Sequence, residues 1–367
     1  MQLRDGLDLT YCTNIHPAAG WNGVRSNLER FAPRLKAALA SDRPFGIGLR
    51  LSAFEACELL QGDRLPRFRD FLESHGLYVA IINGFPYGDF HGVPVKDTVY
   101  APDWRQAARV EYTLNLGRIL EVLLPAGMDG GISTAPLSYK PWQAEFEPMA
   151  RNVAHVGEAL ARIHSETGKS IHLDIEPEPD CLLENTDETI DFFERADVDR
   201  EHVQVCFDCC HFAVEYEDPI AALTRLNRAG IRIGRVQLSS ALRLPAGAQP
   251  DLLRDFVERV YLHQTVARCG ACLRRFADLD RALASDAGGC EWRVHFHVPL
   301  FTGEYGHFSS TQDYVRTVIE AALSGSITSH LEIETYTWDV LPAALKIDLA
   351  DSIRREYEWV LSCIKPQ

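Results

Sequence analysis

Residues 203–211 carry the strongest chemical signal in this chain. They read Val-Gln-Val-Cys-Phe-Asp-Cys-Cys-His, so an apolar strand-like run ends in Asp208 and a histidine follows at His211. Burying an unpaired carboxylate in a strand core is strongly unfavourable. Where a strand runs into a loop, however, an acid and a histidine suit a metal site or a proton-transfer site. The remaining elements must therefore bring partners to this point.

Strand-like and helix-like stretches alternate along the chain. Between the strand candidates, apolar residues recur every three or four positions in 21–40, 103–124, 148–166, 186–196 and 218–229, which predicts amphipathic helices. No glycine-rich phosphate fingerprint follows the first strand candidate. The alternation predicts an α/β fold, a (β/α)8 TIM barrel, with a doubly wound sheet as the alternative. The strand candidates are 9–16, 45–52, 78–85, 131–138, 170–176, 203–208, 231–239 and 330–337.

The region 240–329 departs from this alternation. Its pattern predicts helices at 251–268 and 273–285, an extra strand at 291–301 and another helix near 311–324. We interpret 240–329 as an insertion between strands seven and eight, at the active-site end of a single domain that spans 1–367.

Parity along the strands separates apolar from polar side chains. In 170–176, for example, Ile171, Leu173 and Ile175 share one face, and Glu176 lies on the other. The apolar faces must pack against helices, so the polar faces must point at the barrel axis. Several carboxylates placed together there need a counter-charge, and a divalent cation is the simplest one. The inward set is Asn14, His16, Glu176, Asp208, Gln237, Glu332 and Glu334.

Two arginines also face inward by parity. Arg50 and Arg235 could bind an anionic group of a substrate. The favoured interpretation is that they pair with Asp174 or Glu332 low in the barrel, because buried charges normally have partners.

Two further segments are candidates for the same site. His295 and His297 stand two residues apart in the inserted strand candidate, so both side chains can point the same way. Tyr87, Phe90 and His91 lie in the long loop after 78–85, and we expect that loop to cover the site.

Three strand-end segments resemble the xylose-isomerase-like barrel superfamily, which includes sugar isomerases, ketose 3-epimerases, hydroxypyruvate isomerase and endonuclease IV. Residues 173–179, 206–211 and 331–336 are similar to its strands five, six and eight. The resemblance is closest to the EboE-type metabolite traffic branch, through 9–17, 83–88 and 334–338. It implies the fold and a site for Mn²⁺, Mg²⁺, Co²⁺ or Zn²⁺.

The resemblance also implies roles for individual residues. Glu176, Asp208 and Glu334 take the positions of carboxylate ligands, and His211 that of a histidine that contacts metal or substrate. Strand seven departs from the pattern, because epimerases place a histidine ligand where this chain has Gln237. Either His297 or His295 replaces that ligand, or the site is looser; we predict His297. The predicted substrate-binding residues are His16, Asn83, His211, Gln237 and His295.

The leading functional hypothesis is a metal-dependent sugar or polyol isomerase or epimerase. Glu176 and Glu334 would be its catalytic pair, with one removing a proton next to a carbonyl and the other returning it. One alternative is a binding or pathway-accessory barrel without turnover, which the Gln237 departure favours. Another is a metal-dependent hydrolase.

Composition limits the partners of the chain. Its 367 residues include 46% hydrophobic and 24% charged residues, and the formal charge is −15. This charge argues against nucleic acid and fits a soluble enzyme that acts on a small molecule. The resemblance implies that this molecule is polyhydroxylated. The sequence has no membrane-span candidate and no apolar signal-peptide core, so we expect a cytoplasmic protein whose ten cysteines are reduced thiols, Cys269 and Cys272 included. The sequence leaves open whether the chain forms a homo-oligomer.

Overall fold

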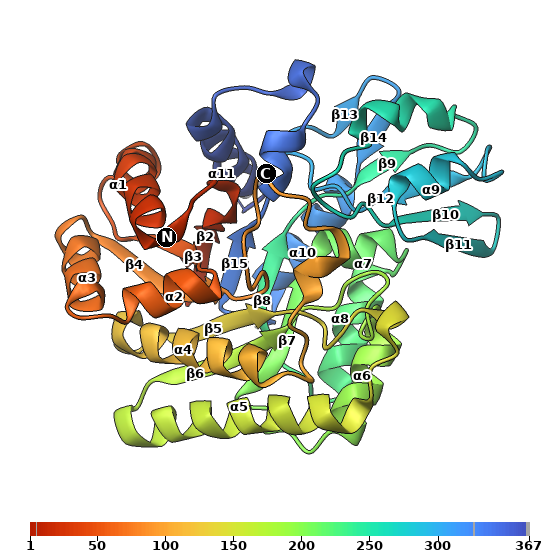
Figure 1. Ribbon diagram of the computed structural model, residues 1–367. Coiled ribbons are helices and arrows are strands. Elements are labelled where there is room, and N and C mark those ends of the chain that lie inside the picture. The colour runs from red at the N-terminus through yellow and green to blue at the C-terminus, as the bar shows by residue number, and fades with distance from the viewer. Residues whose placement is uncertain (5, 326, 365–367) are drawn as a thin grey trace.

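The computed structural model describes residues 1–4, 6–325 and 327–364, in which a parallel barrel is wrapped by helices (Figure 1). The barrel strands follow the order β2-β15-β8-β7-β6-β5-β4-β3. A bridge between Cys12 and Gly48 closes the ring, and a short β1 (Gln2–Arg4) pairs antiparallel with β2. The predicted barrel and its strand regions are confirmed. The strands are β2 (Leu7–Tyr11), β3 (Phe45–Arg50), β4 (Leu77–Asn83), β5 (Asp129–Thr134), β6 (Ser170–Ile175), β7 (Val203–Asp208), β8 (Ile233–Leu238) and β15 (His330–Ile333).

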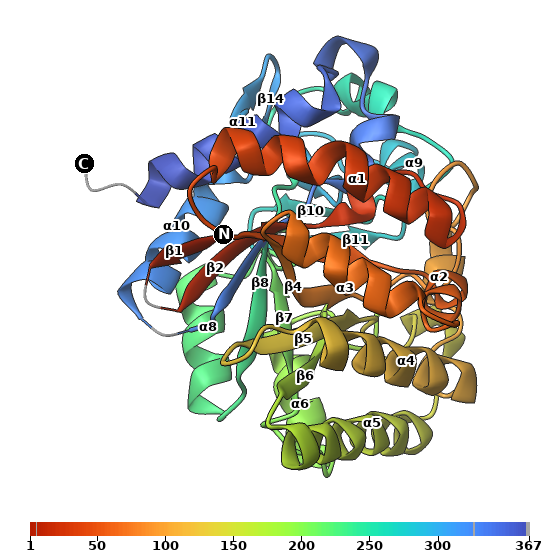
Figure 2. The same cartoon turned by 90° about the vertical axis from the view of Figure 1, so that its left-hand side faces the viewer.

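Helices cover the outside of the barrel, and Figure 2 shows α1, α3, α4 and α5 one after another along it, from top to bottom. The five helices predicted between strands are confirmed as α1, α4, α5, α6 and α8. Gly168 has a φ of 73°, a left-handed conformation that ends α5. The long helices are α1 (Gly20–Leu39), α3 (Arg64–Ser74), α4 (Ala107–Leu123), α5 (Phe146–Thr167), α6 (Thr186–Arg195), α8 (Pro219–Arg228), α10 (Gln312–Ser324) and α11 (Leu349–Ile364); the short ones are α2 (Ala53–Leu59), α7 (Cys209–Val214) and α9 (Leu279–Leu283).

The chain between β8 and α10 forms a second sheet that projects from one end of the barrel (Figure 1). Its strand order is β11-β10-β12-β9-β14-β13. The bounds are β9 (Leu242–Leu244), β10 (Thr265–Cys269), β11 (Cys272–Phe276), β12 (Glu291–Val294), β13 (Glu304–Tyr305) and β14 (Phe308–Ser310).

Two helix predictions in this region are wrong. In 251–268, only the 3₁₀ segment Pro250–Phe256 is helical, and β10 follows it. In 273–285, the strand β11 precedes a single short helix, α9. The β-branched Thr265 and Val266 favour extended chain, and Gly270, with a φ of 63°, permits the tight hairpin turn. The helix predicted near 311–324 is confirmed as α10, which packs on the barrel rather than in the second sheet.

The expectation of unrelated reduced thiols is wrong for one pair. Cys269 and Cys290 form a disulfide with a Cα–Cα distance of 4.8 Å. Pairing of β10 with β12 brings the two residues together although 21 positions separate them in the sequence. In the described part of the chain, no helix has the length and apolar character that crossing a bilayer requires.

A buried ion network fills the middle of the barrel. Arg235 Nε lies 3.0 Å from Asp174 Oδ2, and its Nη1 lies 3.1 Å from Glu332 Oε2, with all three side chains fully buried. The predicted pairing of Arg235 is confirmed. Arg50 instead contacts Glu55 at 3.1 Å, so its predicted pairing with Asp174 or Glu332 is wrong.

The C-terminal helix contributes a buried acid that makes stability depend on pH. Burial raises the pKa of Glu356 in α11 to about 7, although its Oε1 accepts hydrogen bonds from Thr335 Oγ1 (2.6 Å) and from the backbone of Leu300 (3.2 Å). Because the folded pKa lies above the unfolded one, this contribution to stability is full below about pH 4.5 and is lost as pH rises through 7.

In the wild-type protein, Glu356 should lower the unfolding free energy by about 3 kcal/mol between pH 5 and pH 8. We expect Glu356→Gln to abolish this part of the pH dependence. Urea unfolding at the two pH values measures it. Glu358→Gln, on the same helix and half exposed, is the matched control and should keep the wild-type pH dependence. An unchanged slope in the Glu356 variant would contradict the assignment.

Candidate metal centre and active site

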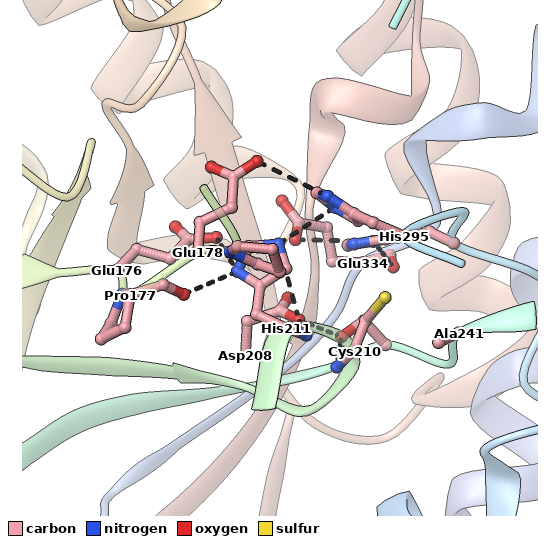
Figure 3. Close-up of polar contacts among 12 residues, drawn as sticks. Glu176, Pro177, Glu178, Asp208, Cys210, His211, Ala241, His295 and Glu334 are labelled. Atoms are coloured by element: carbon pink, nitrogen blue, oxygen red, sulfur yellow. Dashed lines mark hydrogen bonds and ion pairs between the residues drawn. The ribbon is translucent and has the colours of Figure 1, made fainter. Parts of the chain in front are cut away.

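Three carboxylates from three strand ends meet at the C-terminal end of the barrel (Figure 3). Glu176 follows β6, Asp208 is the last residue of β7, and Glu334 follows β15. One oxygen of each lies within 4.8 Å of the others, and all three side chains are buried. The structure thus brings together the carboxylates that parity selected.

Asp208 also organises the turn that the sequence left undefined. Its Oδ1 accepts hydrogen bonds from the backbone N–H of His211 at 2.9 Å and from Ser239 Oγ at 2.7 Å, so Asp208 caps helix α7. Positions three apart share a helix face, and His211 Nε2 therefore returns to 3.8 Å from Asp208 Oδ1. The second oxygen, Oδ2, finds no hydrogen-bond partner within the described residues.

His297 reaches the same centre from the second sheet. Its Nδ1 donates to the backbone carbonyl of Glu334 at 3.0 Å, which leaves Nε2 as the nitrogen with a lone pair. That nitrogen has no partner among residues 1–4, 6–325 and 327–364, and His297 lies within ligand distance of Asp208 and His211. Gln237, in register with Asp208, is fully buried, and both polar atoms of its side chain also lack partners there.

Two amides hold the third carboxylate in place. Asn14 Nδ2 donates to Glu334 Oε1 at 2.8 Å, and Asn83 Nδ2 donates to the same oxygen at 3.2 Å. Oε2 of Glu334 is left facing His297 Nδ1 at 3.8 Å. One oxygen is therefore anchored, and the other is available to a ligand.

His211 and His295 face each other through their Nε2 atoms, which are 3.1 Å apart. His211 Nδ1 must donate to the carbonyl of Pro177, and His295 Nδ1 donates to Gln264 Oε1. Gln264 Nε2 donates to Tyr100 Oη and to a backbone carbonyl, which fixes its orientation. Both facing nitrogens are then acceptors in the neutral rings; Tyr336 Oη, 3.3 Å from His295 Nε2, can donate to one of them, and His211 Nε2 is left open to a ligand.

The charges of the centre perturb one another. Burial and the neighbouring Asp208 carboxylate raise the pKa of Glu176, and burial and the neighbouring Glu176 raise the pKa of Glu334. Burial would raise the pKa of Asp208 too, but the imidazoles of His211 and His297 hold it below its usual value. Burial lowers the pKa of His297 to about 4, which keeps its ring neutral and able to act as a ligand.

An aromatic and apolar pocket lies over these groups. Asn14, Asn83, Glu176, Glu178 and Glu334 are among the polar groups on its wall, with His211 and His295. Phe90 and Tyr336 pack together with ring centroids 5.1 Å apart, and Tyr261 contacts both. The loop after β4 thus covers the site through Phe90, while Tyr87 lines a separate surface hollow. The apolar lining residues are Phe85, Pro86, Phe90, Val95, Val99, Tyr100, Tyr261, Leu262 and Tyr336.

His16 is a predicted substrate-binding residue that the structure does not bring into this pocket. Strand β2 ends at Tyr11 and a 3₁₀ turn follows at Thr13–Ile15, so strand parity no longer applies. The imidazole contacts Tyr11 Oη at 3.2 Å and stacks on Phe31. Asn83, His211 and His295 do line the pocket, whereas Gln237 is buried beside Asp208.

Sequence reasoning missed several wall residues. Glu178 stands between two prolines after β6, and that rigid Pro-Glu-Pro setting was a usable signal. Tyr100 Oη donates to Glu178 Oε1 at 2.7 Å. Tyr261 lines the pocket and Gln264 holds His295, and both come from the irregular chain after the 3₁₀ segment Pro250–Phe256, where the sequence pattern had predicted a helix.

The donor set fits a divalent cation. Glu176 Oε2, Asp208 Oδ2 and His297 Nε2 are buried and lack hydrogen-bond partners in the described part of the chain. Leaving buried carboxylate oxygens and an imidazole nitrogen unsatisfied is costly, and mixed carboxylate and imidazole donors suit Zn²⁺, Co²⁺ or Mn²⁺.

Comparison with known proteins places the fold. The sequence profile of the family described as xylose isomerase-like TIM barrel matches residues 50–255. A xylose isomerase-like TIM barrel protein from Mycobacterium smegmatis in complex with magnesium has a TM-score of 0.56 at 13% identity, covering 98% of this chain and 96% of that chain. The probable 3-DHS dehydratase AsbF from Bacillus anthracis has a TM-score of 0.52 at 13% identity, covering 97% and 99%. The IOLI protein with a bound zinc atom has 0.50 at 12% identity, covering 98% of both chains. No curated protein matches the sequence.

Proposed function

This chain belongs to the xylose isomerase-like TIM barrel family, and from that premise we propose that it is a divalent-metal-dependent isomerase or epimerase of small polyhydroxylated molecules. One observation carries the proposal: Glu176, Asp208 and His297 each keep a buried donor atom without a partner in the described residues, and Asp208 lies within ligand reach of Glu176 and Glu334 on one side and of His297 on another. Two structures with a similar fold contain magnesium and zinc, which supports the proposal that this barrel binds a divalent metal. The EboE-type resemblance adds the proposal that the reaction serves a biosynthetic or traffic pathway.

The proposed ligands are Glu176, Asp208, His297 and Glu334. A bound divalent ion would stabilise negative charge that develops on a substrate oxygen. Burial and the neighbouring carboxylates raise the pKa values of Glu176 and Glu334, a direction that suits groups which exchange protons with a substrate.

In the proposed reaction, the Glu176 carboxylate accepts the proton from the carbon next to the carbonyl, the C–H electron pair forms a C=C bond, and the carbonyl π pair moves onto its oxygen. Glu334, which starts protonated, delivers its proton to the opposite face of that carbon as the C=O bond re-forms. Isomerisation would instead protonate the former carbonyl carbon and move the proton of the neighbouring hydroxyl to the former carbonyl oxygen. Asn14 and Asn83 fix the carboxylate of Glu334 by its other oxygen. Phe90, Tyr261 and Tyr336 give the pocket an aromatic wall beside these carboxylates.

Two measurements test the proposal. Elemental analysis of the purified protein should find a metal that Asp208→Asn removes, because Asp208 is within ligand reach of both other carboxylates and both imidazoles. The metal-loaded protein should then exchange solvent deuterium into at least one member of a ketose and polyol panel. Metal without exchange would favour a metal-dependent hydrolase. No Asp208-dependent metal would favour a binding or accessory barrel, which the unpartnered Gln237 fits.

A further inference from the structure

A second group of possible ligands lies at the opposite, amino-terminal end of the barrel. Asp129 is the first residue of β5, His172 belongs to β6, and His330 is the first residue of β15. Asp129 Oδ1 is 3.4 Å from His330 Nε2, and Asp129 Oδ2 is 3.9 Å from His172 Nε2. One ligand atom from each residue lies within 4.8 Å of the other two.

His172 is held as a metal-ligating histidine is usually held. Its Nδ1 contacts Asp174 Oδ1 at 2.5 Å, and the other oxygen of Asp174 is fixed by Arg235 Nε at 3.0 Å. A carboxylate on one ring nitrogen sets the tautomer and directs the other nitrogen at a metal. In His172 that other nitrogen is Nε2. The His172 side chain is 98% buried, and Nε2 has no hydrogen-bond partner within residues 1–4, 6–325 and 327–364.

The backbone around His172 leaves room for this arrangement. A Cβ on Gly131 would lie 2.5 Å from His172 Cε1, and a Cβ on Gly234 would lie 2.6 Å from His172 Nδ1. Glycine at both positions therefore admits the imidazole into the barrel interior.

Asp129 opens this group to the surface. Its side chain is 45% exposed, whereas those of His172 and His330 are buried. It lines two surface hollows, one shared with Asp8 and Lys169 and the other with Gln204 and Ser329. An ion can therefore reach Asp129 from solvent, where the Ser329 hydroxyl lies 3.0 Å from Oδ1 and 2.8 Å from Oδ2 of the carboxylate.

We propose that Asp129, His172 and His330 bind a second divalent ion of the zinc class, separate from the centre at the other end of the barrel. Two imidazole nitrogens and one carboxylate oxygen are the donor set of three-ligand zinc sites, with water in the fourth position. His330 Nε2 lies 3.2 Å from the backbone carbonyl of Asp129, so it would bind the ion with the ring hydrogen moved to Nδ1, which has no partner among the described residues. The ion would link β5, β6 and β15 near their amino-terminal ends. The metal proposed at Asp208 would link strand ends at the opposite end of the barrel.

Zinc binding in an Asp208→Asn background tests the proposal, because that variant removes the other centre. Dialysis against buffered Zn²⁺ followed by elemental analysis should find one zinc per chain. Asp129→Asn in the same background should weaken zinc binding by about 100-fold or more, since even loss of an outer hydrogen-bond partner costs 10- to 100-fold. Asp42→Asn lies in the same hollow as Asp129 without a place in the ligand group, so it is the matched control and should keep the zinc.

A second readout covers the buried ligands. Added Zn²⁺ should raise the melting temperature of the Asp208→Asn protein but not of its Asp129→Asn or His330→Gln derivatives. Zinc binding that is equal with and without the Asp129 carboxylate would overturn the proposal. So would a background that binds no zinc, which would mean that a proton alone joins His172 to Asp129. Either outcome leaves the Asp208-dependent metal of the wild-type protein as a separate result.

Discussion

Glu176→Gln and Glu334→Gln are each expected to lower kcat by about 10²–10⁴-fold, the range that general acid–base groups contribute. An amide fills the volume of the carboxylic acid but cannot accept or return a proton. Both residues are proposed to act on the substrate in each turnover. We therefore expect each single variant to lose activity.

Solvent deuterium exchange and turnover, on a substrate from the ketose and polyol panel, measure this effect. Glu178→Gln is the matched control, because Glu178 is buried in the same pocket and held by Tyr100 but has no place in the proposed proton transfer. Its kcat should fall far less. Metal content is measured in each variant, so that a loss of metal is separated from a loss of proton transfer. Full activity in either the Glu176 or the Glu334 variant would exclude the paired-carboxylate mechanism.

Arg235→Met is expected to lower the unfolding free energy by about 3–5 kcal/mol, the cost of removing one partner from a buried ion network. Arg235 lies between Asp174 and Glu332, with no exposed surface on any of the three residues. Methionine fills part of the volume but leaves Glu332 without its cation and Asp174 with only His172 as its ionic partner. A loss of this size exceeds most single substitutions.

Chemical denaturation measures this loss, with circular dichroism to confirm that the variant folds. Arg243→Met is the matched control, because the Arg243–Asp313 pair is partly exposed and should contribute about 0–1 kcal/mol. Adding Asp174→Asn to Arg235→Met should recover part of the loss, because it removes one of the stranded charges. A near-neutral Arg235→Met variant would show that the carboxylates are neutralised without the arginine.

The inward carboxylates were predictable because strand parity is a local property. Glu176, Asp208 and Glu334 each stand at the end of an apolar strand, so their direction follows from the residues beside them. The same local rule failed for His16, where the chain leaves β2 for a 3₁₀ turn before the histidine is reached. Parity holds only as far as the strand extends.

The inserted region shows the opposite case. His297 and His295 follow the short strand β12, and their directions depend on contacts with Glu334 and Gln264 from distant parts of the chain. The 251–268 stretch has apolar residues at helical spacing, yet it becomes a 3₁₀ turn and a strand because β10 gains two pairing partners, β11 and β12. Long-range pairing overrode a local pattern.

By itself, the sequence determined the barrel, the order of its strands and the three carboxylates on its axis, because each depends on periodicity within a few neighbouring residues. Only the tertiary structure decided which histidines complete the centre, how the aromatic wall closes over it, and that Cys269 pairs with Cys290. It also decided that Asp129, His172 and His330 meet at the other end of the barrel. These contacts join residues tens to hundreds of positions apart, and no local pattern specifies which of many possible partners folding brings together.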